Sequence, residues 1–76
     1  MELDGTIYYV EFTIWVAGNP IGCVYVVKTN SRDGDGVVRG IKVEKGTTEG
    51  FQDVYIYFDD TSYFYPDAKV SQIKYK

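Results

Sequence analysis

The sequence predicts an all-β fold: a small antiparallel meander of five to six strands curled into an SH3-like or OB-like barrel. The first observation is the abundance of residues that favour strands, with eight Tyr, four Phe and one Trp among 76 residues. The second is that Gly, Asn, Asp or Pro interrupts the apolar runs about every ten residues, as between short strands. The third is that no long segment has the apolar spacing of an amphipathic helix. Residues 1–76 are expected to form a single β domain.

Residues 6–17 give the strongest strand prediction because their pattern has a period of two. One face is wholly apolar and comprises Tyr8, Val10, Phe12, Ile14 and Val16. A strand of this length is expected to bend or to extend beyond its own sheet. The Gly-Asn-Pro run at 18–20 predicts a turn, because Gly and Asn tolerate positive φ and Pro lacks the N–H of a ladder bond. Residues 21–29 return as a hairpin partner, and the consecutive apolar residues 24–27 indicate that both of its faces are covered.

The remaining strands follow from the same signals. Polar residues and glycines at 30–36 predict a loop, and residues 37–45 the third strand. After a flexible connection at 46–50, residues 51–59 form the fourth strand, with Val54, Ile56 and Phe58 on one face. A turn at 59–61 leads to a short fifth strand, 62–65, which ends at Pro66, and residues 70–75 form a sixth. If the sheet does not close, a second copy of the chain is expected to cover its open face.

Aromatic side chains remain after one face of each strand has been assigned to the core. They are Tyr9, Trp15, Tyr55, Tyr57, Tyr63 and Tyr65. One interpretation is an interface with a partner protein or with a second copy, because interfaces are enriched in Tyr and Trp. A second is that the rings stack the bases of single-stranded nucleic acid. A third is that a closed barrel covers its own sheet and the tyrosines surround its rim.

Acidic residues decide among the possible partners. The chain carries a net charge of −3, whereas a nucleic-acid binder needs a basic stripe, so nucleic acid is not expected. Asp53, Asp59 and Asp60 are predicted to form a charged rim beside the aromatic face, which favours a basic protein partner. The loop around Asp33 resembles the first half of an EF-hand calcium loop, but Lys42 occupies the position of the bidentate carboxylate. We expect no metal and no cofactor.

Catalytic groups are scarce. The chain has no His and one Cys, which excludes a Ser–His–Asp triad, a Cys–His pair, an intrachain disulfide and the usual zinc sites. Cys23 lies in an apolar run and is expected to be a small buried side chain. A domain of this size often needs disulfides, a metal or a partner for stability, so homo-oligomerisation is expected; the alternative is stabilisation by an unusually aromatic core. We predict that the protein is not an enzyme.

The compartment and function follow from these exclusions. The acidic start of the chain does not resemble a signal peptide, and no apolar run reaches the ~18–20 residues of a membrane span, so a cytoplasmic location is predicted, or a host cytoplasm if the gene is viral. The predicted function is a non-enzymatic protein-binding module, in one form a phage or mobile-element inhibitor of a host enzyme. The alternatives are a structural subunit of a larger homo-oligomeric assembly and a small-ligand binder with an aromatic pocket between subunits.

Overall fold

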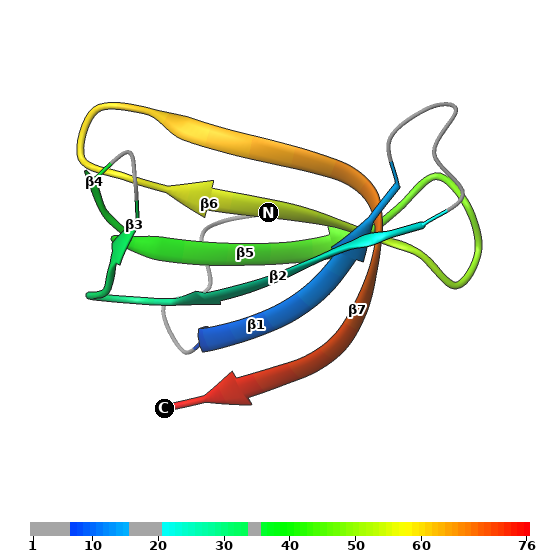
Figure 1. The fold of residues 1–76 in the computed structure, drawn as a ribbon, viewed down its shortest axis with the longest axis horizontal. Coiled ribbons are helices and arrows are strands. Elements are labelled where there is room, and N and C mark those ends of the chain that lie inside the picture. The colour runs from blue at the N-terminus through cyan, green and yellow to red at the C-terminus, as the bar shows by residue number, and fades with distance from the viewer. Residues whose placement is uncertain (1–6, 16–20, 34–35) are drawn as a thin grey trace.

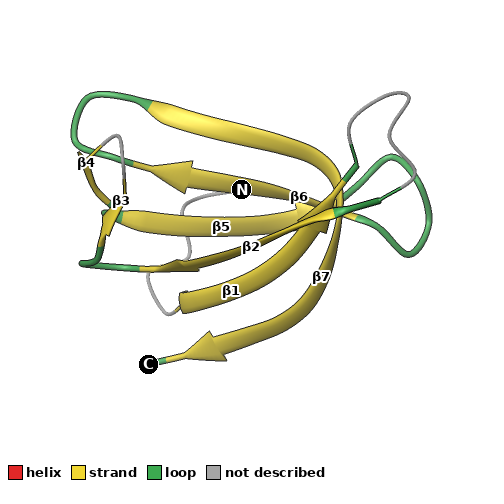
Figure 2. Cartoon of the chain, in the orientation of Figure 1, coloured by secondary structure: helices red, strands yellow, loops and turns green. Residues whose placement is uncertain are grey.

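The computed structural model describes residues 7–15, 21–33 and 36–76, and these residues form strands and loops without a helix (Figure 2). The strands are β1 (Ile7–Ile14), β2 (Cys23–Lys28), β3 (Arg32–Asp33), β4 (Gly36–Val37), β5 (Gly40–Lys45), β6 (Gln52–Tyr57) and β7 (Ser62–Tyr75). Five of them form an antiparallel sheet in the order β2-β1-β7-β6-β5, and β3 and β4 form a separate two-stranded hairpin. The all-β prediction is therefore confirmed.

Strand β7 joins the two halves of the sheet. Its first half pairs with β6 and its second half with β1, and Figure 1 shows it wrapping from one half to the other. The prediction of two strands separated at Pro66 is wrong. Pro66 and Asp67 lie together opposite Asp53, in a register shift between the pairs Gln52–Ala68 and Val54–Tyr65. A bulge tolerates Pro, because its missing N–H costs no ladder bond there.

A second irregularity bends β7 further. The register with β1 shifts between the pairs Glu11–Gln72 and Phe12–Val70, which leaves Ser71 as the extra residue. The Ser71 hydroxyl donates a hydrogen bond of 3.1 Å to the Glu11 carbonyl. Bulges increase local twist, so the two irregularities curl the sheet toward one side.

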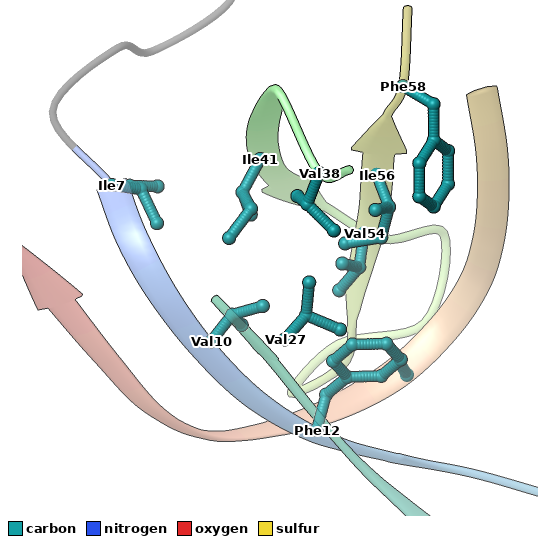
Figure 3. Packing of buried hydrophobic residues seen from close by; sticks show 10 residues of the cluster. Ile7, Val10, Phe12, Val27, Val38, Ile41, Val54, Ile56 and Phe58 are labelled. Carbon is teal, nitrogen blue, oxygen red and sulfur yellow. The ribbon is translucent and has the colours of Figure 1, made fainter. Parts of the chain in front are cut away.

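The hydrophobic core occupies the inner side of this curl. It comprises Ile7, Val10, Phe12, Val27, Val38, Ile41, Val54, Ile56, Phe58 and Ala68, and Figure 3 shows side chains from both halves of the sheet pointing toward one another. The predicted buried face of residues 51–59 is confirmed. The alternation placed Ile7 on the face of the strand that does not carry Val10, yet Ile7 is buried. The reason is that the β1–β7 register shifts between Ile7 and Tyr9.

The structure corrects the prediction that both faces of residues 21–29 are covered. β2 is the edge strand beside β1, and every residue from Cys23 to Val26 is exposed. The barrel is not confirmed, since the sheet leaves β2 and β5 as separate edges. Beyond the end of β2, Asn30 donates to the Val38 carbonyl at 2.8 Å and Val38 donates to the Ser31 carbonyl at 3.0 Å.

Several predicted boundaries also change. The first strand ends at Ile14, and the predicted turn at 18–20 lies outside the described residues. The predicted loop at 30–36 contains β3 and the first residue of β4, and the third strand begins at Gly40. The connection at 46–50 is confirmed, and its ends are joined by a 2.9 Å hydrogen bond from the N–H of Gly46 to the Phe51 carbonyl.

Candidate protein-binding surfaces

Three aromatic rings stack on the outer side of β6 and β7. Tyr55 pairs with Phe64 across the two strands, and their ring centroids are 4.7 Å apart at an interplanar angle of 26°. Tyr57, two residues along β6, stacks on Tyr55 at 6.3 Å and 14°. These rings alternate with the buried Val54 and Ile56, so they lie on the face opposite the core. We call Tyr55, Tyr57 and Phe64 the outer aromatic surface.

A lysine and a glutamate from β5 flank this surface. Lys42 pairs with Tyr55 in the β5–β6 ladder and places its Nζ 4.5 Å from the ring centroid, a cation–π distance. The same Nζ lies 3.6 Å from Oε1 of Glu44. Loss of hydration raises the pKa of the Tyr55 phenol, and the negative charge of Glu44 adds to the rise. The Lys42 cation is thus already engaged by the chain itself.

The structure places Tyr63 and Tyr65 on the inner side, away from Tyr55 and Tyr57. Tyr65 packs against the core, with ring centroids 5.2 Å from Phe12 and 5.4 Å from Tyr25. Tyr63 meets the buried Phe58 edge-on at 5.5 Å. The two tyrosines pair with Val54 and Ile56, whose side chains are buried. The six predicted aromatic residues therefore do not form one face.

Tyr9 and Trp15 lie on the other half of the sheet. Lys74 places its Nζ 4.5 Å from the centroid of the Tyr9 ring. Trp15 is 48% exposed and meets Phe51 edge-on at 6.3 Å. Gly22 lies beneath Trp15, because a Cβ built on Gly22 would come within 2.9 Å of the indole ring.

The three predicted rim aspartates have different surroundings. Asp53 accepts a 2.9 Å hydrogen bond from the N–H of Asp67 and so binds the backbone at the bulge of β7. Asp59 forms a 2.8 Å ion pair with Nε of Arg39, and this hydrogen bond lowers the pKa of the Asp59 carboxyl. Asp60 is exposed and, among the described residues, has neither an ion pair nor a hydrogen bond. Asp60 is thus the rim charge that is open to a partner.

Sequence reasoning missed Phe64, Val24 and Val26. Phe64 lies in a wholly aromatic run with Tyr63 and Tyr65, where no polar residue marks the outer side of the strand. Val24 and Val26 were expected to be covered, yet they are 65% and 57% exposed. Cys23 was expected to be buried and is an exposed free thiol.

The described part of the chain lacks a cluster of metal-ligating side chains. No group of three His, Cys, Asp or Glu side chains there is arranged to hold a metal ion. An open depression at the bend of β7 is lined by Gln52, Val70, Ser71, Gln72 and Ile73, and its residues include no acid, base or aromatic ring. Residues 7–15, 21–33 and 36–76 also include no helix suited to crossing a bilayer.

Comparisons with models of protein families, with curated proteins and with solved structures find no match to this chain.

Proposed function

We propose that this protein is a non-enzymatic binding module for another protein, which it contacts through the outer aromatic surface. The observation that carries the proposal is the stack of Tyr57, Tyr55 and Phe64 on a face that no other described element covers. Phe64 is 50% exposed, whereas the two tyrosines are half-buried by their neighbours. Rigid aromatic side chains of this kind provide large contact areas at a low cost in conformational entropy.

The charges around this surface favour a basic partner. Arg39 is paired with Asp59, and Lys42 is held between Glu44 and Tyr55, so neither cation is free. Asp60, in the turn between β6 and β7, keeps an open negative charge, and the whole chain has a net charge of −3. Charge complementarity of this kind mainly speeds association and sets orientation. An inhibitor that occupies a basic groove of a host enzyme is one form that this function would take.

The test compares a substitution on the proposed surface with one elsewhere. The immobilised wild-type chain, Phe64→Ser and Tyr75→Ser are each used to capture proteins from a lysate, and a captured protein is purified and titrated against all three. Phe64 and Tyr75 are both exposed aromatic residues, at 50% and 59%, but Tyr75 lies at the far end of β7. We expect Phe64→Ser to lose binding at defined stoichiometry and Tyr75→Ser to retain it. Equal binding by the two variants would contradict the proposal.

Asp60→Lys tests the charge separately. Because Asp60 makes no contact that holds the fold among the described residues, the variant should keep the wild-type melting temperature. Its association rate with a basic partner should fall, and the difference from wild type should shrink as salt is raised. An unchanged association rate at low salt would exclude the acidic rim from recognition.

A further inference from the structure

On its outward side, β2 pairs with no other described strand. The N–H of Thr29 donates to the Tyr8 carbonyl at 2.9 Å. This bond and the β1–β2 register determine which residues of β2 direct their backbone N–H and C=O toward β1. In an antiparallel pair, residues that bond the neighbouring strand alternate with residues whose N–H and C=O point away from it. Tyr25 and Val27 therefore bond β1, whereas Val24 and Val26 direct both backbone groups away from the sheet.

The side chains of this edge are apolar as well. Val24 and Val26 share the outer face and are 65% and 57% exposed. Tyr25 lies on the inner face, where its ring meets Phe12 at 5.5 Å, and it remains 36% exposed. An exposed apolar strand with unpaired backbone groups is a template for another strand.

The other edge strand of the sheet carries features that discourage pairing, and β2 does not. The opposite edge of the sheet, β5, includes Lys42, Glu44 and Lys45. The β2 register with β1 is unbroken, and its sequence, Cys-Val-Tyr-Val-Val-Lys, has no Pro and a charge only at its end. Lysines, prolines and bulges are the usual protection of edge strands.

We propose that β2 pairs with β2 of a second copy of this chain, antiparallel and centred on Tyr25, so that one continuous sheet runs through both copies. The β2 edge is separate from the outer aromatic surface, so the chain would use it independently of the proposed function. The register follows from the backbone groups that are free. Lys28 also points outward, but its carbonyl already accepts hydrogen bonds from the N–H and the hydroxyl of Ser31. Pairing centred on Tyr25 joins Val24 to the second copy's Val26, and the hydrogen bonds of these pairs do not use the Lys28 carbonyl.

The outer side chains agree with this register. Val24 and Val26 of both copies form one apolar patch, and the paired positions bring no like charges opposite each other. Lys28 falls opposite the second copy's Gly22, the residue over which Trp15 lies. A lysine at that position is placed to make a cation–π contact with an indole ring that is 48% exposed in the single chain.

A charge-swap pair tests the proposal. Light scattering behind a sizing column measures the mass of wild type, Val24→Lys/Val26→Lys and Val24→Lys/Val26→Glu over a hundredfold range of concentration. Both variants remove the same valines, but only the first sets each introduced lysine opposite an introduced lysine of the second copy. We expect wild type and the Lys/Glu variant to reach dimer mass and the Lys/Lys variant to stay monomeric with an intact melting transition. Wild type that remains monomeric up to about 1 mM, or a Lys/Lys variant that dimerises like wild type, would overturn the proposal.

A disulfide reports the register directly. In Cys23→Ser/Tyr25→Cys the thiols of the two copies occupy a non-hydrogen-bonded antiparallel pair, whose Cα separation of about 4.5 Å suits a disulfide. Under mild oxidation this variant should form a covalent dimer, whereas wild-type Cys23, which would face Val27, should not. Linkage of wild type through Cys23 and no linkage of the variant would reject the register centred on Tyr25. Phe64→Ser, the variant that tests the proposed function, should leave the dimer mass unchanged.

Discussion

Aspartates at neighbouring positions have different roles in this structure. Asp59 is tied to Arg39 by hydrogen bonds of 2.8 Å from Nε and 3.3 Å from a terminal nitrogen, whereas Asp60 is unpaired among the described residues. Both lie in the same exposed turn between β6 and β7. The sequence does not distinguish these two adjacent carboxylates, because Arg39, which pairs with Asp59, is 20 residues distant along the chain.

The Arg39–Asp59 pair predicts a dependence on pH. The hydrogen bond from Arg39 lowers the pKa of Asp59 in the folded chain, so the pair stabilises the fold above the ordinary aspartate pKa. That contribution is lost as the pH falls through the lowered folded-state pKa. Carboxyl titration by NMR should show Asp59 titrating at a lower pH in wild type than in Arg39→Gln. Identical midpoints would contradict the ion pair.

At the scale of elements, the bend of β7 is held to the loop between β5 and β6. Asp67 has a positive φ of 49°, and its carboxylate accepts hydrogen bonds from the N–H of Thr47 at 3.1 Å and of Thr48 at 3.3 Å. Its own N–H donates to Asp53. The bulge therefore depends on polar contacts between segments that are far apart in the sequence. These contacts cannot be read from the local sequence, so the sequence-based prediction ended the strand at Pro66.

Removing the Asp67 carboxylate should loosen this bend. Asp67→Ala loses the acceptor for both threonine N–H groups and also strains the positive φ, so the free energy of unfolding should fall by about 1–3 kcal/mol. Asp67→Asn keeps an acceptor oxygen and tolerates the backbone conformation, and its loss should be smaller. Urea unfolding of both variants and of Asp60→Ala measures the difference. If Asp67→Ala is as stable as Asp60→Ala, the carboxylate does not hold the bend.

For the whole molecule, the sequence predicted the fold class and the inner face of β6, but the closed barrel that it also predicted is not confirmed. Alternation identified Val54, Ile56 and Phe58 because polar or amphipathic residues separate them. The consecutive apolar residues of β2 fit a covered strand and an exposed edge equally well, and only the sheet order distinguishes the two.

The sequence predicted only part of the candidate binding surface, again because the face of a strand cannot always be assigned from its pattern. Tyr55 and Tyr57 lie on one outer surface, but Tyr63 and Tyr65 lie on the inner face of β7, beside the core. Side chains alternate between the two faces of a strand, so an error of one residue in the predicted alternation reverses the faces.

Amide hydrogen exchange at β2 shows whether the outward edge of this strand is open. At a concentration where the chain is monomeric, we expect Val24 and Val26 to exchange fast, while Tyr25 and Val27, bonded to β1, are protected. On concentration into the dimer, Val24 and Val26 should become protected too, and the emission of the sole tryptophan, Trp15, should change. Protection of Val24 and Val26 equal to that of Val27 in the monomer would contradict an open β2 edge, because the chain would then cover this edge itself.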